Sequence, residues 1–65
     1  MGRNNKKKAA NLDNPETVKE LGNKAFLAGD FKEAISQYSN AIQMTEQNPN
    51  AIYYSNRANA YLELQ

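Results

Sequence analysis

The stretch that decides the fold of this chain is residues 21–35, Leu21-Gly22-Asn23-Lys24-Ala25-Phe26-Leu27-Ala28-Gly29-Asp30-Phe31-Lys32-Glu33-Ala34-Ile35. It reads as the end of one helix, a tight turn at Gly29-Asp30 and the start of a second helix. Gly29 can adopt the left-handed conformation that ends a helix. Asp30, followed three residues later by Glu33, forms the capping box that begins one. The small residues Gly22 and Ala34 lie where the two helices must come close.

Apolar residues continue this helical hairpin in both directions. They recur at helical spacing on both sides of the turn, first as Val18, Leu21, Gly22, Ala25 and Phe26 and then as Phe31, Ala34, Ile35, Tyr38, Ala41 and Ile42. Asn14-Pro15-Glu16 is typical of a helix start, because Asn caps free backbone N–H groups and Pro suits the first helical position. The sequence therefore predicts helices over residues 15–28 and 31–44.

A third helix is predicted over residues 50–64, after a polar loop that contains Pro49. Either Asn48 or Asn50 could cap this helix. Its buried face is predicted to consist of apolar residues at helical spacing, with Ile52 and Tyr53 beside it: Tyr54, Ala58, Tyr61 and Leu62. Three of these residues fall 36 positions after Val18, Gly22 and Ala25, so the third helix repeats the first.

Composition excludes several classes of function. The 65 residues include no cysteine and no histidine, so the chain has no disulfide, no thiolate metal site and no imidazole base. No paired carboxylates suggest catalysis. We predict no catalytic residue, no metal site, no cofactor and no enzymatic activity. No apolar stretch approaches the roughly 18 residues of a membrane span.

The net charge of +1 is unevenly distributed. Residues 1–14 carry four basic side chains and one acidic one, a net charge of +3, whereas residues 15–65 carry four basic and six acidic ones, a net charge of −2. The helical part therefore lacks the basic surface of a nucleic-acid-binding module. Residues 1–13 are polar and basic, and we predict a disordered leader there. For Lys6-Lys7-Lys8 a solubilising role is favoured over a nuclear-import or anion-binding patch.

The helical hairpin and its partial repetition resemble a tetratricopeptide repeat (TPR), a helix-turn-helix unit with a period of 34 residues. The observed offset of 36 indicates two extra residues in the loop around residues 46–49. The resemblance covers residues 15–65. It implies an all-α solenoid fragment of three helices, one full repeat and the first helix of the next. Because such arrays need about three repeats to bury a continuous core, we expect an N-terminal or truncated piece of a larger protein. We expect this piece to be marginally stable or to self-associate in isolation.

A narrower resemblance involves Lys19, the run Gly22-Asn23-Lys24-Ala25-Phe26 and the run Tyr54-Ser55-Asn56-Arg57-Ala58. These look like the carboxylate-clamp TPR domains of co-chaperones such as the Hsp-organising protein, the small glutamine-rich TPR proteins and protein phosphatase five. The resemblance implies that Lys19, Asn23 and Asn56 bind the C-terminal Glu-Glu-Val-Asp of cytosolic heat-shock chaperones of the seventy- and ninety-kilodalton classes. Phe26 and Asn59 are candidates for further contacts in the groove. The family's other two clamp residues, a Lys and an Arg, belong to a third repeat that this chain does not contain.

The predicted function is therefore that of a cytoplasmic, co-chaperone-like peptide-binding module. Two alternatives remain open. The chain could be the TPR docking domain of a larger enzyme, such as a phosphatase or a prolyl isomerase, which the residues after Gln65 would reveal. It could also be a structural TPR scaffold with another partner, which a third repeat without the clamp Lys and Arg would favour.

Overall fold

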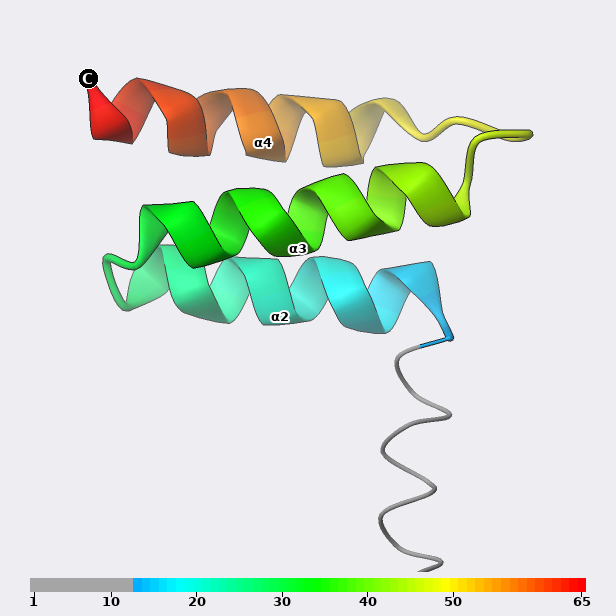
Figure 1. Cartoon of the computed structure of the whole chain (residues 1–65), viewed down its shortest axis with the longest axis horizontal. Coiled ribbons are helices and arrows are strands. Elements are labelled where there is room, and N and C mark those ends of the chain that lie inside the picture. The colour runs from blue at the N-terminus through cyan, green and yellow to red at the C-terminus, as the bar shows by residue number, and fades with distance from the viewer. Residues whose placement is uncertain (1–12) are drawn as a thin grey trace, which may run out of the picture.

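A computed structural model describes residues 13–65 of the chain. Its three helices are α2 (Pro15–Leu27), α3 (Phe31–Met44) and α4 (Ala51–Leu64). The helices run side by side in alternating directions, with α3 between the other two (Figure 1). The predicted all-α, three-helix fold is confirmed. The predicted leader lies outside the described residues, apart from Asp13.

The turn between α2 and α3 follows the local sequence closely. Gly29 has φ +84°, the left-handed conformation predicted for it. The Asp30 N–H donates to the Ala25 carbonyl at 2.8 Å, and the Gly29 N–H donates to the Phe26 carbonyl at 3.0 Å. These two bonds form a Schellman motif, which satisfies carbonyls that the end of the helix would leave free. The turn fixes the direction in which α3 returns along α2.

Each helix begins at a side-chain cap. The Asn14 side chain accepts from the Glu16 N–H at 2.9 Å, and Asn50 accepts from the Ile52 N–H at 2.9 Å. Asn50, and not Asn48, therefore caps α4. Asp30 accepts from the Glu33 N–H at 3.2 Å. The capping box is only half formed, because the Glu33 carboxylate accepts from the Gln37 side-chain amide at 2.7 Å and the Asp30 N–H is used in the turn.

Small residues bring α2 and α3 together. Gly22 is buried, and a Cβ atom added there would lie only 2.6 Å from Cε1 and 2.7 Å from Cδ1 of Tyr38. The aromatic ring therefore packs directly on the backbone of α2. Ala34 and Ala41 of α3 are fully buried. Ala34 belongs to a core cluster with Tyr38 and Ala60, and Ala41 belongs to a second cluster with Val18 and Tyr53.

The predicted buried face of α4 is wrong. Tyr54, Tyr61 and Leu62 are 46%, 51% and 62% exposed, and Ala58 is exposed as well. The side chains that α4 buries are Tyr53, which is 2% exposed, and Ala60. The helix carries two apolar faces, and α3 covers the one on which small Ala60 permits close approach. The periodicity of the sequence shows both faces but does not show which one a neighbouring helix covers.

Candidate functional site

A groove of about 330 Å³ lies on the surface formed by the three helices. Residues of α2, α3 and α4 line it, namely Asn23, Phe26, Leu27, Tyr38, Asn56 and Asn59. Four of the side chains singled out from the sequence, Asn23, Phe26, Asn56 and Asn59, therefore lie around one hollow. The groove combines three carboxamides with the apolar side chains of Phe26 and Leu27. Such a surface can donate hydrogen bonds to a polar backbone or a carboxylate and pack against an apolar side chain.

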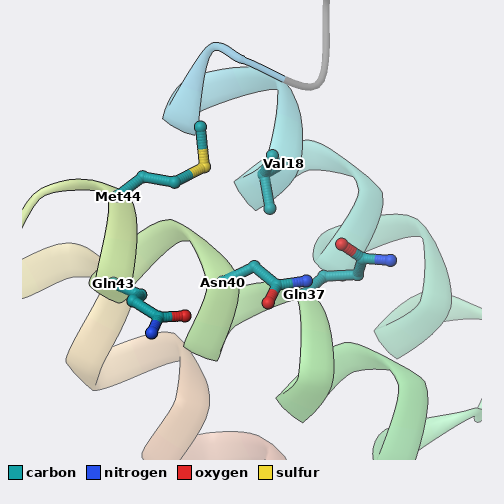
Figure 2. A pocket seen from close by; sticks show the side chains of 5 residues that line it. All are labelled: Val18, Gln37, Asn40, Gln43 and Met44. Carbon is teal, nitrogen blue, oxygen red and sulfur yellow. The ribbon is translucent and has the colours of Figure 1, made fainter. Parts of the chain in front are cut away.

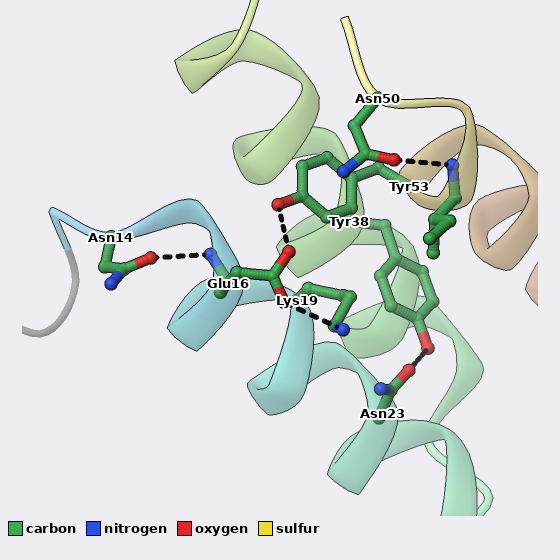
Figure 3. Close-up of polar contacts among 8 residues, drawn as sticks. Asn14, Glu16, Lys19, Asn23, Tyr38, Asn50 and Tyr53 are labelled. Atoms are coloured by element: carbon green, nitrogen blue, oxygen red, sulfur yellow. Dashed lines mark hydrogen bonds and ion pairs between the residues drawn. The ribbon is translucent and has the colours of Figure 1, made fainter.

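Tyr38 orients the amide of Asn23. Its hydroxyl donates to Asn23 Oδ1 at 2.5 Å (Figure 3). Burial raises the pKa of Tyr38 above its ordinary value, which keeps the phenol protonated and able to donate. With the amide oxygen held by α3, the Asn23 NH₂ group remains as a donor. The sequence pattern indicates Tyr38 only as a packing residue and gives no signal for Leu27 in the groove. Gly22 is the feature of the sequence that could have indicated this role of Tyr38. An aromatic ring that packs on Gly22 can reach the adjacent Asn23.

Lys19 lies one turn before Asn23 on α2 and is not among the residues that line the groove. Its ammonium nitrogen is 3.0 Å from Glu16 Oε1, and its side chain is only 20% exposed. Lys19 and Asn23 share a helix face, as an i, i+4 pair does. The role of Lys19 in the clamp remains a prediction, and the sequence did not indicate its interaction with Glu16.

Glu16 connects α2 to α4. The Tyr53 hydroxyl donates to Glu16 Oε2 at 2.7 Å, while Oε1 pairs with Lys19 (Figure 3). The Tyr53 hydrogen bond, and then Lys19, hold the pKa of Glu16 below its usual value. Burial, and then the contact with Glu16, raise the pKa of Tyr53. Glu16 is therefore an anion and Tyr53 a neutral donor across the neutral pH range.

Arg57 follows Asn56 on α4 but makes contacts elsewhere. Its Nη1 group donates to Ser39 Oγ of α3 at 3.0 Å, and its guanidinium carbon is 5.7 Å from the centroid of the Tyr54 ring. Arg57 therefore helps to join α3 to α4 and is not positioned as a groove cation.

A second hollow, of about 520 Å³, is formed mainly by α3 and shares no lining residue with the groove (Figure 2). Val18, Gln37, Asn40, Gln43 and Met44 line it. All five side chains are uncharged, so this hollow offers no cation to an acidic ligand. Over residues 13–65, no group of three or more acidic side chains is arranged to hold a metal ion. Within the same residues, no helix is long and apolar enough to cross a membrane.

Comparison with known proteins agrees with the fold. Residues 22–65 match the TPR repeat family. The chain belongs to this family, whose repeats act as protein-interaction units and not as catalysts.

Among the similar proteins, the chain is 45% identical over 62 residues to the chloroplastic outer envelope protein 64 of Arabidopsis thaliana, covering 95% of the chain and 10% of that protein. It is 41% identical over 59 residues to the mitochondrial import receptor subunit TOM70 of Rattus norvegicus, covering 86% of the chain and 10% of the receptor. It is 38% identical over 56 residues to serine/threonine-protein phosphatase 5 of Solanum lycopersicum, again covering 86% and 10%. The chain thus spans about a tenth of the length of these relatives. No solved structure matches it.

Proposed function

We propose that this chain binds the C-terminal carboxylates of an extended peptide, of the kind that ends cytosolic heat-shock chaperones. The observation that carries the proposal is the meeting of Asn23 and Asn56, from two different helices, around one groove. Phe26 and Asn59 line the same groove and are proposed to contact the peptide further from its end.

The chemistry of these side chains suits such a ligand. A C-terminal aspartate carries two carboxylates close together, and the asparagines supply NH₂ donors while Lys19 supplies a full positive charge. Hydrogen bonds to charged groups contribute about 1.5–3 kcal/mol each. Capture of a C-terminal carboxylate is a recurring mode of peptide recognition. Because the proposed ligands are cytosolic chaperones, we also propose that the chain is located in the cytoplasm.

The relatives favour a second form of this function, in which the same groove serves as the docking site of a larger protein. One relative is a phosphatase and another is named as an import receptor subunit. A TPR unit in an enzyme or a receptor would recruit a partner by the same contacts while another domain acted on it.

Titration by NMR tests the proposal on the isotope-labelled chain. A peptide ending in Glu-Glu-Val-Asp with a free C-terminus should shift the side-chain amide signals of Asn23 and Asn56, and the same peptide with an amidated C-terminus should bind far more weakly. The 65-residue chain should bind weakly, because it offers three of the family's five clamp groups. A protein that also carried the third repeat should reach the micromolar range, about −8 kcal/mol.

Three variants localise the interaction. Asn23→Ala should weaken binding, because it removes a donor to the carboxylate. Lys19→Ala should weaken it and also reduce its dependence on salt, because it removes a charge. Lys32→Ala removes an equal charge from an exposed position on α3 and should change nothing. Equal binding of the free and amidated peptides would show that the groove takes a different ligand.

A further inference from the structure

We propose that Glu16 is an internal competitor of the peptide, which occupies the ammonium of Lys19 and weakens the binding of acidic ligands. This inference rests on the proposed function. It concerns a residue that the sequence presents only as part of a helix start.

The contacts of Glu16 define its role. One carboxylate oxygen is 3.0 Å from the Lys19 ammonium, and the other accepts from the Tyr53 hydroxyl at 2.7 Å. An ammonium and a hydroxyl are the kinds of donor that would hold a peptide carboxylate. Glu16 therefore already provides at this position the same chemical group as the proposed ligand.

Tyr53 keeps the competitor in place. Its ring is buried in the core with Val18 and Ala41, so its hydroxyl has little freedom to move. Glu16 itself is 54% exposed and, without this bond, would be held only by its ion pair with Lys19. Because Tyr53 lies on α4 and Glu16 on α2, the carboxylate is tied to both helices that carry the proposed clamp asparagines.

Two effects of Glu16 on the ligand oppose each other. By pairing with Lys19 it orders a long side chain, but a single i, i+3 pair on a helix contributes little. By its charge it repels the ligand, since two carboxylates sharing one ammonium lie about 6 Å apart at most. At that distance, even with the dielectric constant of water, the repulsion weakens binding about threefold. The charge effect is the larger one, and the limited exposure of Lys19 increases it.

The experiment compares Glu16→Gln with Glu46→Gln by titration with the peptide ending in Glu-Glu-Val-Asp. Both variants lose one negative charge, but Glu46 lies exposed in the loop between α3 and α4. Glu16→Gln should bind the peptide about threefold or more tightly than the unaltered chain at low salt, and this gain should shrink as salt is added. The gain should be smaller for the amidated peptide, which carries one charge less. Glu46→Gln should bind as the unaltered chain does.

Tyr53→Phe separates charge from structure, because it keeps the buried ring and removes only the hydroxyl. The negative charge of Glu16 remains beside Lys19 but loses one of its two contacts, so this variant should show only a small part of the gain. Circular dichroism establishes that each variant is folded. A gain in Tyr53→Phe equal to that in Glu16→Gln would overturn the proposal, as would binding by Glu16→Gln that is unchanged or weaker. If the unaltered chain and every variant fail to bind the free acid, the proposed function fails as well; if they bind without the gain, only this inference fails.

Discussion

At Gly22 the absence of a side chain allows Tyr38 to pack on α2 and to donate to Asn23. A methyl group there would lie 2.6 Å from a ring carbon of Tyr38, so the ring would have to move. Overpacking of this kind costs about 1–3 kcal/mol, and the better helix propensity of alanine offsets about 1 kcal/mol of it. We therefore expect Gly22→Ala to destabilise the chain by about 1 kcal/mol in urea unfolding.

The same variant should shift the side-chain amide signals of Asn23, because displacement of the ring breaks the hydrogen bond from Tyr38. Ala28→Gly, at the end of α2 and exposed, serves as a control that should leave these signals in place. A more stable Gly22→Ala chain would show that helix propensity outweighs the close approach of the ring.

Single residues were predictable where the signal is local. The groove positions of Asn23, Phe26, Asn56 and Asn59 followed from helical spacing and from resemblance. The Tyr53–Glu16 contact joins residues 37 positions apart and has no local signature. The pairing of Lys19 with Glu16 was visible in the sequence only as one of several i, i+3 and i, i+4 combinations.

At the scale of the helices, the boundaries agree closely with those predicted, because caps and turns are encoded by a few neighbouring residues. The predicted ranges 15–28, 31–44 and 50–64 compare with Pro15–Leu27, Phe31–Met44 and Ala51–Leu64. The buried face of α4 was not predictable in the same way. It depends on which neighbouring helix covers it, and only the three-dimensional arrangement decides between its two apolar faces.

The cap of α4 gives a prediction at this scale. Asn50→Ala should destabilise the chain by about 1 kcal/mol, because the Ile52 N–H loses its acceptor at the start of the helix. Amide hydrogen exchange at Ile52 should accelerate as the first turn frays. Asn48→Ala is the matched control, since Asn48 is exposed and its side chain does not cap the helix. Equal effects of the two substitutions would argue against the observed cap.

For the whole molecule, the arrangement of the helices leaves more apolar surface exposed on α4 than on α3. The repeat resemblance predicts that the buried face of the second helix, led by Ile35, Tyr38 and Ile42, is not fully covered. In the structure Tyr38 is buried, and Ile35 and Ile42 pack against the core. Most of the exposed large apolar side chains are on α4, where Tyr54, Tyr61 and Leu62 lie on one side of the helix, while Leu27 of α2 and Met44 of α3 are exposed elsewhere.

This face leads us to expect that the 65-residue chain self-associates as its concentration rises, because contiguous exposed apolar surface drives association. Sedimentation velocity over a range of concentrations measures this directly. Leu62→Lys should shift the equilibrium toward monomer, since it places a charge at the most exposed of the three side chains without opening the core. Met44→Lys adds the same charge at an exposed apolar position on α3 and should leave association unchanged. If the unaltered chain stays monomeric at every concentration, or if the two variants behave alike, the α4 face is not the surface through which copies meet.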